Sequence, residues 1–317
     1  MTAAVNVALR QGSDEWLAYR RTGVSASDIP VLLGLSPYKC EADLADEKLG
    51  LAETPQTIPM KVGLALEDLI ASEYEAQTGR RVQRFRSILR HPDIEWAIAS
   101  PDRRVIGEQR VVELKHTGSS SRFSDGLPQD VEAQVAWQLG VLGWPVADVA
   151  VLVGGRELLP PFEVRADLAL FANLVTVAED FRRRLDAGGP FARDTARIKR
   201  DYPADNGAEM VADGDMDMAA KALADLRTQR KRMEASETAL EDAIKGRMGE
   251  IAVVRGNGWH ATWKRTKDRE ETDWRSLAAG LLRQLPETEA QALVGIHSSV
   301  RQGFRPFRLV VEKEDES

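Results

Sequence analysis

The fold of this chain is decided by the stretch Ala99-Ser-Pro-Asp102-Arg-Arg-Val-Ile-Gly107-Glu-Gln-Arg-Val-Val-Glu113-Leu-Lys115-His-Thr117. Two short apolar runs flank Gly107, which predicts a β-hairpin. Asp102 precedes the first strand, and Glu113 and Lys115 lie near the end of the second. Because side chains alternate along a strand, Glu113 and Lys115 point the same way, about 6.6 Å apart. The turn would fold Asp102 back beside them.

Two carboxylates in this arrangement suit a divalent cation. Asp102 and Glu113, with the exposed backbone carbonyl of Leu114, can hold Mg²⁺ and leave positions for water and a phosphate oxygen. Mn²⁺ is expected to substitute for it. Lys115 can orient that water or help to deprotonate it. This acid, acid, lysine arrangement is therefore that of a metal-dependent nuclease.

The Glu-x-Lys triplet is too short to identify a site alone. With 50 acidic residues among 317, an acid stands two positions before about one lysine in six by chance. A second copy, Asp46-Glu-Lys48, lies in a polar predicted helix with no adjoining strand, whereas Lys115 closes an apolar run. The alternative for the hairpin residues is a solvated edge with a surface ion pair, worth about 0–1 kcal/mol.

Composition bounds the class of protein. A chain of 317 residues with 43% hydrophobic side chains can bury a proper core. The single cysteine, Cys40, excludes an intramolecular disulfide framework. Since no apolar run reaches 18 residues and no signal peptide is recognisable, we expect a cytoplasmic protein without a membrane partner. A formal net charge of −7 means that any DNA contact must be local.

Strands and helices are expected to alternate in an α/β layer architecture. The predicted helices cover residues 12–21, 25–33, 41–49, 60–78, 128–142 and 167–185. The predicted strands around the hairpin cover residues 82–89, 96–99, 146–153 and 158–164.

A change of composition near residues 202–207 predicts a domain boundary, with a catalytic domain over 1–204 and a C-terminal appendage over 205–317. Apolar residues at seven-residue spacing predict a long amphipathic helix in the appendage, from about Met216 to Met248. Short strands are expected at 259–264 and 304–311, before an acidic, frayed tail at 312–317.

Two further features support the nuclease interpretation. Two metal ions about 3.5–4 Å apart need more negative charge than two carboxylates supply. Glu67 is the candidate third acid, because it lies beside apolar residues on a predicted helix. Gln134 and Gln138 share one face of the helix that follows the lysine strand. Their amides can hold a scissile phosphate, and solvated side chains are the alternative for all three residues.

Five segments in this order resemble the YqaJ-like viral recombinase family of phage exonucleases, relatives of the lambda exonuclease in the Asp…Glu-x-Lys nuclease superfamily. The resemblance spans about residues 10–200, and its segments are Arg21-Thr-Gly-Val-Ser-Ala-Ser27 with Leu33-Gly-Leu-Ser-Pro-Tyr38, Gly63-Leu-Ala-Leu-Glu67, Ser100-Pro-Asp102, Val112-Glu-Leu-Lys115 and Gln134-Val-Ala-Trp-Gln138. It implies a restriction-endonuclease-like fold, in which a mixed central sheet is flanked by helices. It also implies a Mg²⁺-dependent exonuclease that degrades one strand of linear duplex DNA from 5′ ends, leaving single strand for a recombination annealing protein.

The resemblance assigns roles to particular residues. Asp102, Glu113 and the Leu114 carbonyl would ligate metal, Lys115 would serve the water, and Glu67 would complete the site, directly or through water. The residues expected to contact DNA, chiefly at a 5′-terminal phosphate, are Arg21, Ser27, Ser100, Gln134 and Gln138. Arg20 could take the place of Arg21. A homo-oligomer, a ring-shaped trimer by the same resemblance, is a further expectation.

Two other functions remain open. One is a RecB-like nuclease that acts on single strands. The other is a nuclease fold kept as a non-catalytic DNA-binding subunit. The intact triad of Asp102, Glu113 and Lys115 argues against the second, because a binding subunit has no need of a metal-chelating triad.

Overall fold

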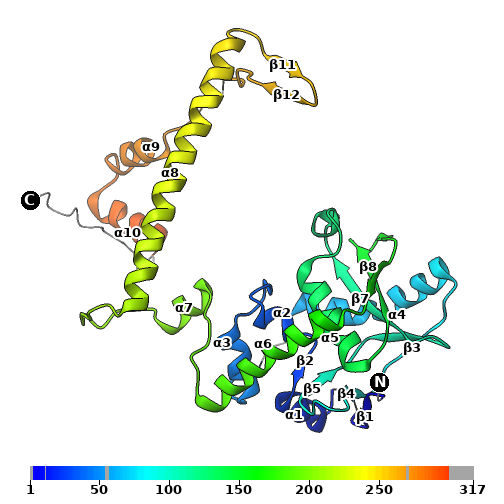
Figure 1. Cartoon of the computed structure of the whole chain (residues 1–317). Coiled ribbons are helices and arrows are strands. Elements are labelled where there is room, and N and C mark those ends of the chain that lie inside the picture. Colours follow the sequence, from blue (N-terminus) through cyan, green and yellow to red (C-terminus); the bar gives the residue numbers. More distant parts are fainter. Residues whose placement is uncertain (1–2, 11, 54–56, 269–270, 300–317) are drawn as a thin grey trace, which may run out of the picture. The chain divides into compact units, whose positions relative to one another are not determined.

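The computed structural model describes residues 3–10, 12–53, 57–268 and 271–299, and the chain divides into two units, Met1–Tyr202 and Pro203–Ser317 (Figure 1). Among the described residues, none of the helices combines the length and apolar character needed to cross a bilayer. The roles expected for the two parts of the chain stay predictions.

The first unit contains two sheets, and the hairpin belongs to the larger one. Its helices are α1 (Asp14–Thr22), α2 (Ile29–Leu32), α3 (Glu41–Lys48), α4 (Ile58–Thr78), the 3₁₀ turn η1 (Ser120–Phe123), α5 (Gln129–Leu142), α6 (Leu168–Ala187) and α7 (Thr195–Asp201). Its strands are β1 (Val5–Val7), β2 (Val24–Ser25), β3 (Val82–Arg84), β4 (Ile88–Arg90), β5 (Ala97–Ala99), β6 (Arg103–Val105), β7 (Arg110–Thr117), β8 (Val146–Val153), β9 (Glu157–Leu158) and β10 (Phe162–Arg165).

The six-stranded sheet forms the centre of this unit. Its order is β10-β8-β7-β6-β3, with β9 paired to β8. The predicted hairpin is present as the antiparallel pair β6 and β7, whereas β7 and β8 are parallel and joined through α5. The chain order is helix α4, the antiparallel strands β3, β6 and β7, the crossover helix α5 and the parallel strand β8. This is the expected restriction-endonuclease-like fold, a mixed sheet flanked by helices.

The two faces of β7 meet different helices. Val111 packs in one apolar cluster with Val135 and Trp137 of α5, and Val112 and Leu114 pack in another with Ile70 of α4. The odd-numbered side chains of β7 therefore face α5, and the even-numbered ones face α4, as the alternation along a strand requires.

The four-stranded sheet, in the order β1-β4-β5-β2, brings the N-terminal segment to the hairpin. Here β2 runs parallel to β5, with Ser25 opposite Ile98. The chain segments that leave these two strands, towards Ser27 and towards Ser100, therefore emerge at the same edge.

Three predicted elements differ from the structure. The strand expected at residues 158–164 is two strands, β9 and β10, because Pro160 and Pro161 between them have no backbone N–H to donate to a sheet. The helix expected at residues 25–33 is a short strand and a turn followed by α2, because Asp28 binds back to the backbone nitrogen of Ser25 and closes the turn. The strand expected at residues 82–89 is two strands in different sheets, since β3 pairs with β6 whereas β4 pairs with β1 and β5.

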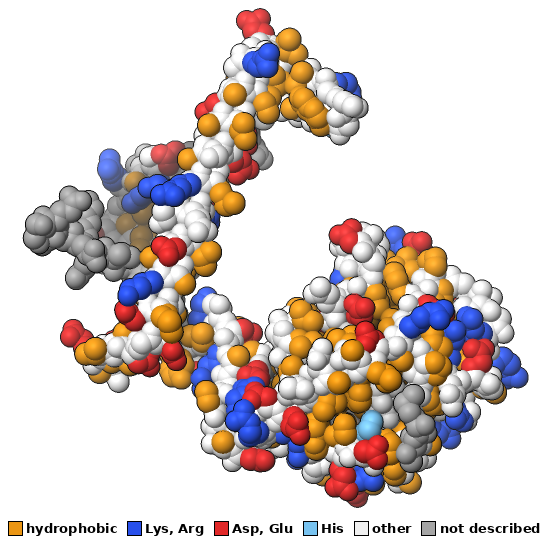
Figure 2. All heavy atoms as spheres, in the orientation of Figure 1, with side chains coloured by type: hydrophobic (Ala, Val, Ile, Leu, Met, Phe, Trp, Pro, Cys, Tyr) orange, Lys and Arg blue, Asp and Glu red, His pale blue; other side chains and the backbone are white. Residues whose placement is uncertain are grey.

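The second unit begins with the long helix that the seven-residue spacing predicts. Its elements are α8 (Gly214–Met248), β11 (Val253–Gly256), β12 (Trp259–Thr262), α9 (Trp274–Leu282) and α10 (Glu287–His297). Hydrophobic side chains lie exposed along α8, among them Leu226, Met233 and Leu240 (Figure 2). The strand expected at residues 304–311 and the tail at 312–317 lie outside the described residues.

Candidate active site

The hairpin register brings the two predicted metal-binding carboxylates together. Arg103 pairs with Val112, so Asp102 stands opposite Glu113, one step beyond that pair. The backbone nitrogen of Leu114 donates to Oδ2 of Asp102 at 2.8 Å. This bond fixes the Asp102 carboxylate against the strand that carries Glu113.

Glu113 is held from three sides. Its side chain is buried, and it accepts hydrogen bonds from Lys115 Nζ at 2.7 Å, Gln134 Nε2 at 2.7 Å and Gln138 Nε2 at 2.8 Å. Lys115 Nζ also donates to Oε1 of Gln134 at 2.9 Å. The structure thus brings four predicted residues into one network on the α5 side of β7.

The two glutamines expected to contact DNA hold the Glu113 carboxylate. Both amide nitrogens donate to Glu113, because the odd face of β7 packs directly beneath α5. The Oε1 atom of Gln138 is buried with no hydrogen-bond partner among the described residues. Gln138, which is 1% exposed, is therefore a residue that orients the carboxylate.

Burial and crowded negative charge define the electrostatics of this network. Burial first, and the charge of Glu113 second, raise the pKa of Asp102 well above its usual range. Burial lowers the pKa of Lys115, but the charges of Glu113 and Asp102 outweigh it, so that pKa is raised. The site therefore holds more negative charge than Lys115 alone compensates.

This donor set fits a hard divalent cation. The carboxylates of Asp102 and Glu113 and the backbone carbonyl of Leu114 are oxygen donors of the kind that Mg²⁺ prefers. Among the described residues, however, no group of three or more acidic, imidazole or thiol side chains is arranged to hold a metal ion. The two opposed carboxylates are the part of the expected site that this structure assembles.

Glu67 approaches from the other side of the sheet. It lies on α4, which covers the even-numbered face of β7, and its charge helps to raise the pKa of Asp102. Its Oε2 lies 3.3 Å from Nη1 of Arg103 and 3.4 Å from Nη2 of Arg84. Glu67 is thus paired with arginines and is not joined to the other two acids.

Arg103 is a residue that the sequence interpretation missed. Its side chain is 4% exposed and donates to the Asp102 carbonyl at 2.9 Å and to Asp68 at 2.7 Å, besides its contact with Glu67. It ties α4 to the backbone of the hairpin at Asp102. The sequence held a signal for this pairing. Strand alternation places Arg103 on the face that α4 covers, and a buried cation there needs a carboxylate partner.

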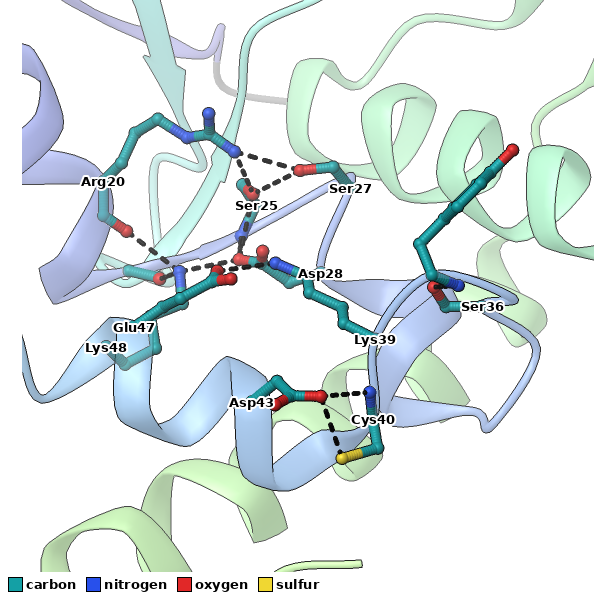
Figure 3. A network of polar contacts seen from close by, with 12 residues as sticks. Arg20, Ser25, Ser27, Asp28, Ser36, Lys39, Cys40, Asp43, Glu47 and Lys48 are labelled. Carbon is teal, nitrogen blue, oxygen red and sulfur yellow. Dashed lines mark hydrogen bonds and ion pairs between the residues drawn. The ribbon is translucent and has the colours of Figure 1, made fainter. Parts of the chain in front are cut away.

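The second predicted group, around the N-terminal serines, is assembled by Arg20 and not by Arg21 (Figure 3). Nη2 of Arg20 donates to Oγ of Ser25 at 3.1 Å and to Oγ of Ser27 at 3.0 Å. Arg21 instead points outward and lies 3.8 Å from Glu53. The physical reason is helical periodicity, because Arg20 follows buried Trp16 by four residues and stacks over its ring at 4.8 Å.

Ser100 is half-buried and follows β5, at the edge where Ser27 follows the parallel strand β2. It stands two residues before Asp102. Arg20, Ser25 and Ser27 form the Arg20 cluster. Residues 100–102 therefore run from the sheet edge at which Ser27 of this cluster follows β2 to the acidic network. Gln134, the remaining residue expected at a terminal phosphate, belongs to the acidic network.

Asp28 and Lys48 form a buried ion pair beneath the Arg20 cluster. Nζ of Lys48 lies 2.7 Å from Oδ2 of Asp28, and their side chains are 7% and 5% exposed. Burial raises the pKa of Asp28, but the charges of Lys48 and Arg20 and the hydrogen bonds outweigh it and lower that pKa from 3.8 to about 2. Lys48 thus belongs to this buried pair. The Asp46-Glu-Lys48 triplet contributes no residue to the acidic network.

This depressed pKa predicts an acid dependence of stability. The ionised Asp28 should contribute about 2 kcal/mol to the free energy of unfolding above pH 3.8, and that contribution falls as the pH falls towards 2. The charged groups that face it are Lys48 and Arg20. Denaturant unfolding of the unmodified protein and Asp28→Asn should show a difference in the free energy of unfolding that shrinks by about 1 kcal/mol between pH 7 and pH 3. Exposed Asp186→Asn is the control, and a difference that stays constant over this range would contradict the prediction.

Comparison with known proteins agrees with the resemblance seen in the sequence. Residues 15–145 match the model of the YqaJ-like viral recombinase domain. The chain is 29% identical over 265 residues to the uncharacterized protein YqaJ of Bacillus subtilis (strain 168), covering 79% of this chain and 83% of that protein.

Two solved structures are also similar. An alkaline exonuclease from Laribacter hongkongensis has 23% sequence identity and a TM-score of 0.47, over 56% of this chain and 94% of the exonuclease. A phage-related exonuclease from Haemophilus somnus 129PT has 13% identity and a TM-score of 0.41, over 52% of this chain and 96% of that one. The matched segment, residues 15–145, includes Asp102, Glu113 and Lys115, so these residues lie in the part of the chain that is similar to the YqaJ-like viral recombinase domain.

Proposed function

We propose that the chain is a Mg²⁺-dependent exonuclease that hydrolyses phosphodiester bonds of linear duplex DNA from 5′ ends and leaves single strand for recombination. The observation that carries this proposal is the buried network in which Asp102 opposes Glu113 while Lys115 binds Glu113 and Gln134. A buried group of like charges is costly to a fold, and such groups cluster where chemistry needs them.

The residues of the network have distinct parts in this proposal. Asp102, Glu113 and the Leu114 carbonyl would hold Mg²⁺, with Mn²⁺ able to replace it. A bound ion acidifies a coordinated water and stabilises charge on the departing oxygen. Lys115 places an ammonium group beside the reacting phosphate, where negative charge develops. Gln134 and Gln138 keep the Glu113 carboxylate oriented.

A second ion would draw on Glu67 as well. In the structure Glu67 contacts Arg103 and Arg84, so a two-ion site requires it to exchange an arginine for a cation or to act through water. The positive charge of Arg103 beside the Asp102 carbonyl would then remain close to the phosphate. DNA ends are the proposed partner, with an annealing protein and a second copy of the chain, in a ring-shaped trimer, as further expectations.

Digestion of end-labelled duplex DNA tests the function directly. We expect linear duplex to lose nucleotides from its 5′ ends when Mg²⁺ or Mn²⁺ is present, and digestion to stop when a chelator is added. Covalently closed circular duplex is the matched control, because it has the same backbone and no end. Equal digestion of the circle would refute an exonuclease, and faster digestion of single strands than of duplex would favour the RecB-like alternative.

Absence of digestion at every metal concentration would favour the remaining alternative, a non-catalytic DNA-binding subunit. Duplex labelled at the 3′ end of one strand separates the two polarities. An enzyme that starts at 5′ ends releases that label last, whereas one that starts at 3′ ends releases it first.

A further inference from the structure

The buried ion pair beneath the Arg20 cluster uses every proton of one ammonium group. Nζ of Lys48 donates to the Arg20 carbonyl at 2.9 Å, to the Gly23 carbonyl at 2.6 Å and to Oδ2 of Asp28 at 2.7 Å. The two carbonyls belong to the C-terminal end of α1, where backbone oxygens lack partners within the helix. Lys48 therefore ties the end of the helix that carries Arg20 to the turn that carries Ser25.

Asp28 fixes the other side of this connection. Its Oδ2 accepts from the backbone nitrogen of Ser25 at 2.8 Å and from Oγ of Ser25 at 2.9 Å. Burying two charges rarely adds net stability over an apolar pair of the same size. The pair instead fixes the positions of Arg20 and Ser25, because each of its other hydrogen bonds ends on one of these residues or on the backbone next to them.

The direction of the hydroxyl protons follows from donor and acceptor chemistry (Figure 3). An ionised carboxylate only accepts, so Ser25 gives its single hydroxyl proton to Asp28. Arg20 only donates, so it takes a lone pair from each serine. The 3.1 Å contact between the Oγ atoms of Ser25 and Ser27 must then use the Ser27 proton. Of the two serines, only Ser27 has a proton free to turn towards an incoming acceptor.

The charges of the group also favour an anion. Asp28 is neutralised by Lys48, which leaves the positive charge of Arg20 at the surface of the group. Nη2 of Arg20 binds the two serines, and the guanidinium has further N–H donors. A terminal phosphate offers acceptors only and carries up to two negative charges, so it complements Arg20 together with the Ser27 proton.

We propose that the Asp28–Lys48 pair is a positioning device for a terminal-phosphate site, in which Arg20 and Ser27 donate to the phosphate while Ser25 gives its proton to Asp28 and accepts from Arg20. The inference rests on the proposed function, because the phosphate is that of a 5′ DNA end. It assigns a role to Lys48 and separates the roles of two adjacent serines.

Equilibrium binding tests the inference without turnover. The affinity of a 5′-phosphorylated duplex is divided by that of the same duplex with 5′-hydroxyl ends, measured by fluorescence anisotropy in the presence of a chelator. We expect this ratio to fall about tenfold or more in Ser27→Ala, and less than about threefold in Ser25→Ala, because a hydrogen bond to the phosphate is lost only in the first. A larger fall in Ser25→Ala than in Ser27→Ala would overturn the assigned proton directions.

Lys48→Met should also lower the ratio about tenfold, since it frees the end of α1 and leaves the charge of Asp28 behind the phosphate. Arg184→Met is the matched control. Arg184 pairs at 2.5 Å with Glu41, which lies on α3 as Lys48 does, and the two side chains are 24% and 10% exposed. Their other hydrogen bonds go to Asp180, Pro190 and Ala192, which are not part of the Arg20 cluster. The control should be destabilised with its ratio unchanged.

A double variant keeps the test decisive if Lys48→Met does not fold. Asp28→Asn with Lys48→Met removes both charges, keeps the net charge of the group and still loses the fixed positions, so its ratio should fall about tenfold. An unchanged ratio in this folded variant would show that the pair is merely structural. A ratio of one in the unmodified protein would refute the terminal-phosphate site itself, whether or not the protein digests DNA.

Discussion

Replacing Lys115 with alanine, or Asp102 with asparagine, should lower the rate of Mg²⁺-dependent DNA digestion by at least about a hundredfold. Each change removes a group placed beside developing charge or a carboxylate placed to hold the cation, and losses of this size are usual for such groups. The measurement is the initial rate of nucleotide release from end-labelled linear duplex at saturating Mg²⁺.

The stability of these two variants separates chemistry from folding. Asp102→Asn removes a charge that Glu113 repels, and Lys115→Ala leaves Glu113 with both glutamine amides. We therefore expect thermal midpoints close to that of the unmodified protein. Lys61→Ala, at an exposed position on α4, is the control for removing a lysine. Activity within about tenfold of normal in both variants would refute the assigned site.

The second large effect concerns two adjacent arginines. Arg20→Ala should reduce the preference for 5′-phosphorylated over 5′-hydroxyl ends by about 10- to 150-fold at subsaturating DNA, because one charge-assisted hydrogen-bonding group is lost, worth about 1.5–3 kcal/mol. Arg21→Ala should leave the preference nearly unchanged, since Arg21 lies against Glu53. Arg20→Lys should recover only part of the loss, because lysine lacks the planar fork of donors.

The measurement is the ratio of initial digestion rates on the two kinds of end. The neighbouring variant controls for loss of one positive charge from α1. A larger loss of preference in Arg21→Ala than in Arg20→Ala would assign the phosphate contact to Arg21, as the sequence first predicts.

The hairpin shows how far local pattern carries a prediction. Spacing and alternation were sufficient to place Glu113 and Lys115 on one face of a strand and to bring Asp102 opposite. The four-residue spacing of Gln134 and Gln138 likewise predicts their shared face. These relations depend on the period of one element or on one short turn, so the sequence expresses them directly.

Relations between distant elements were not accessible in the same way. Lys48 reaches Asp28 and the end of α1 across 20 to 28 residues, and no periodicity reports such a contact. The pairing of Glu67 with Arg103 depends on which face of the sheet α4 covers. The choice of Arg20 over Arg21 was accessible in principle, because Trp16 marks the inward face of α1 four residues earlier.

The division of β7 into a reactive face and a core face limits how this segment can change in length. Inserting one residue between Arg110 and Glu113 would turn Lys115 and Glu113 into the apolar layer of α4 and present Leu114 to α5, since a slip of one position exchanges the two faces. The residues of the turn around Gly107 are exposed, and an insertion there leaves the alternation along β7 unchanged. Divergent relatives of this domain should therefore vary in length at the hairpin turn, while the number of residues from the first paired position of β7 to the lysine stays constant.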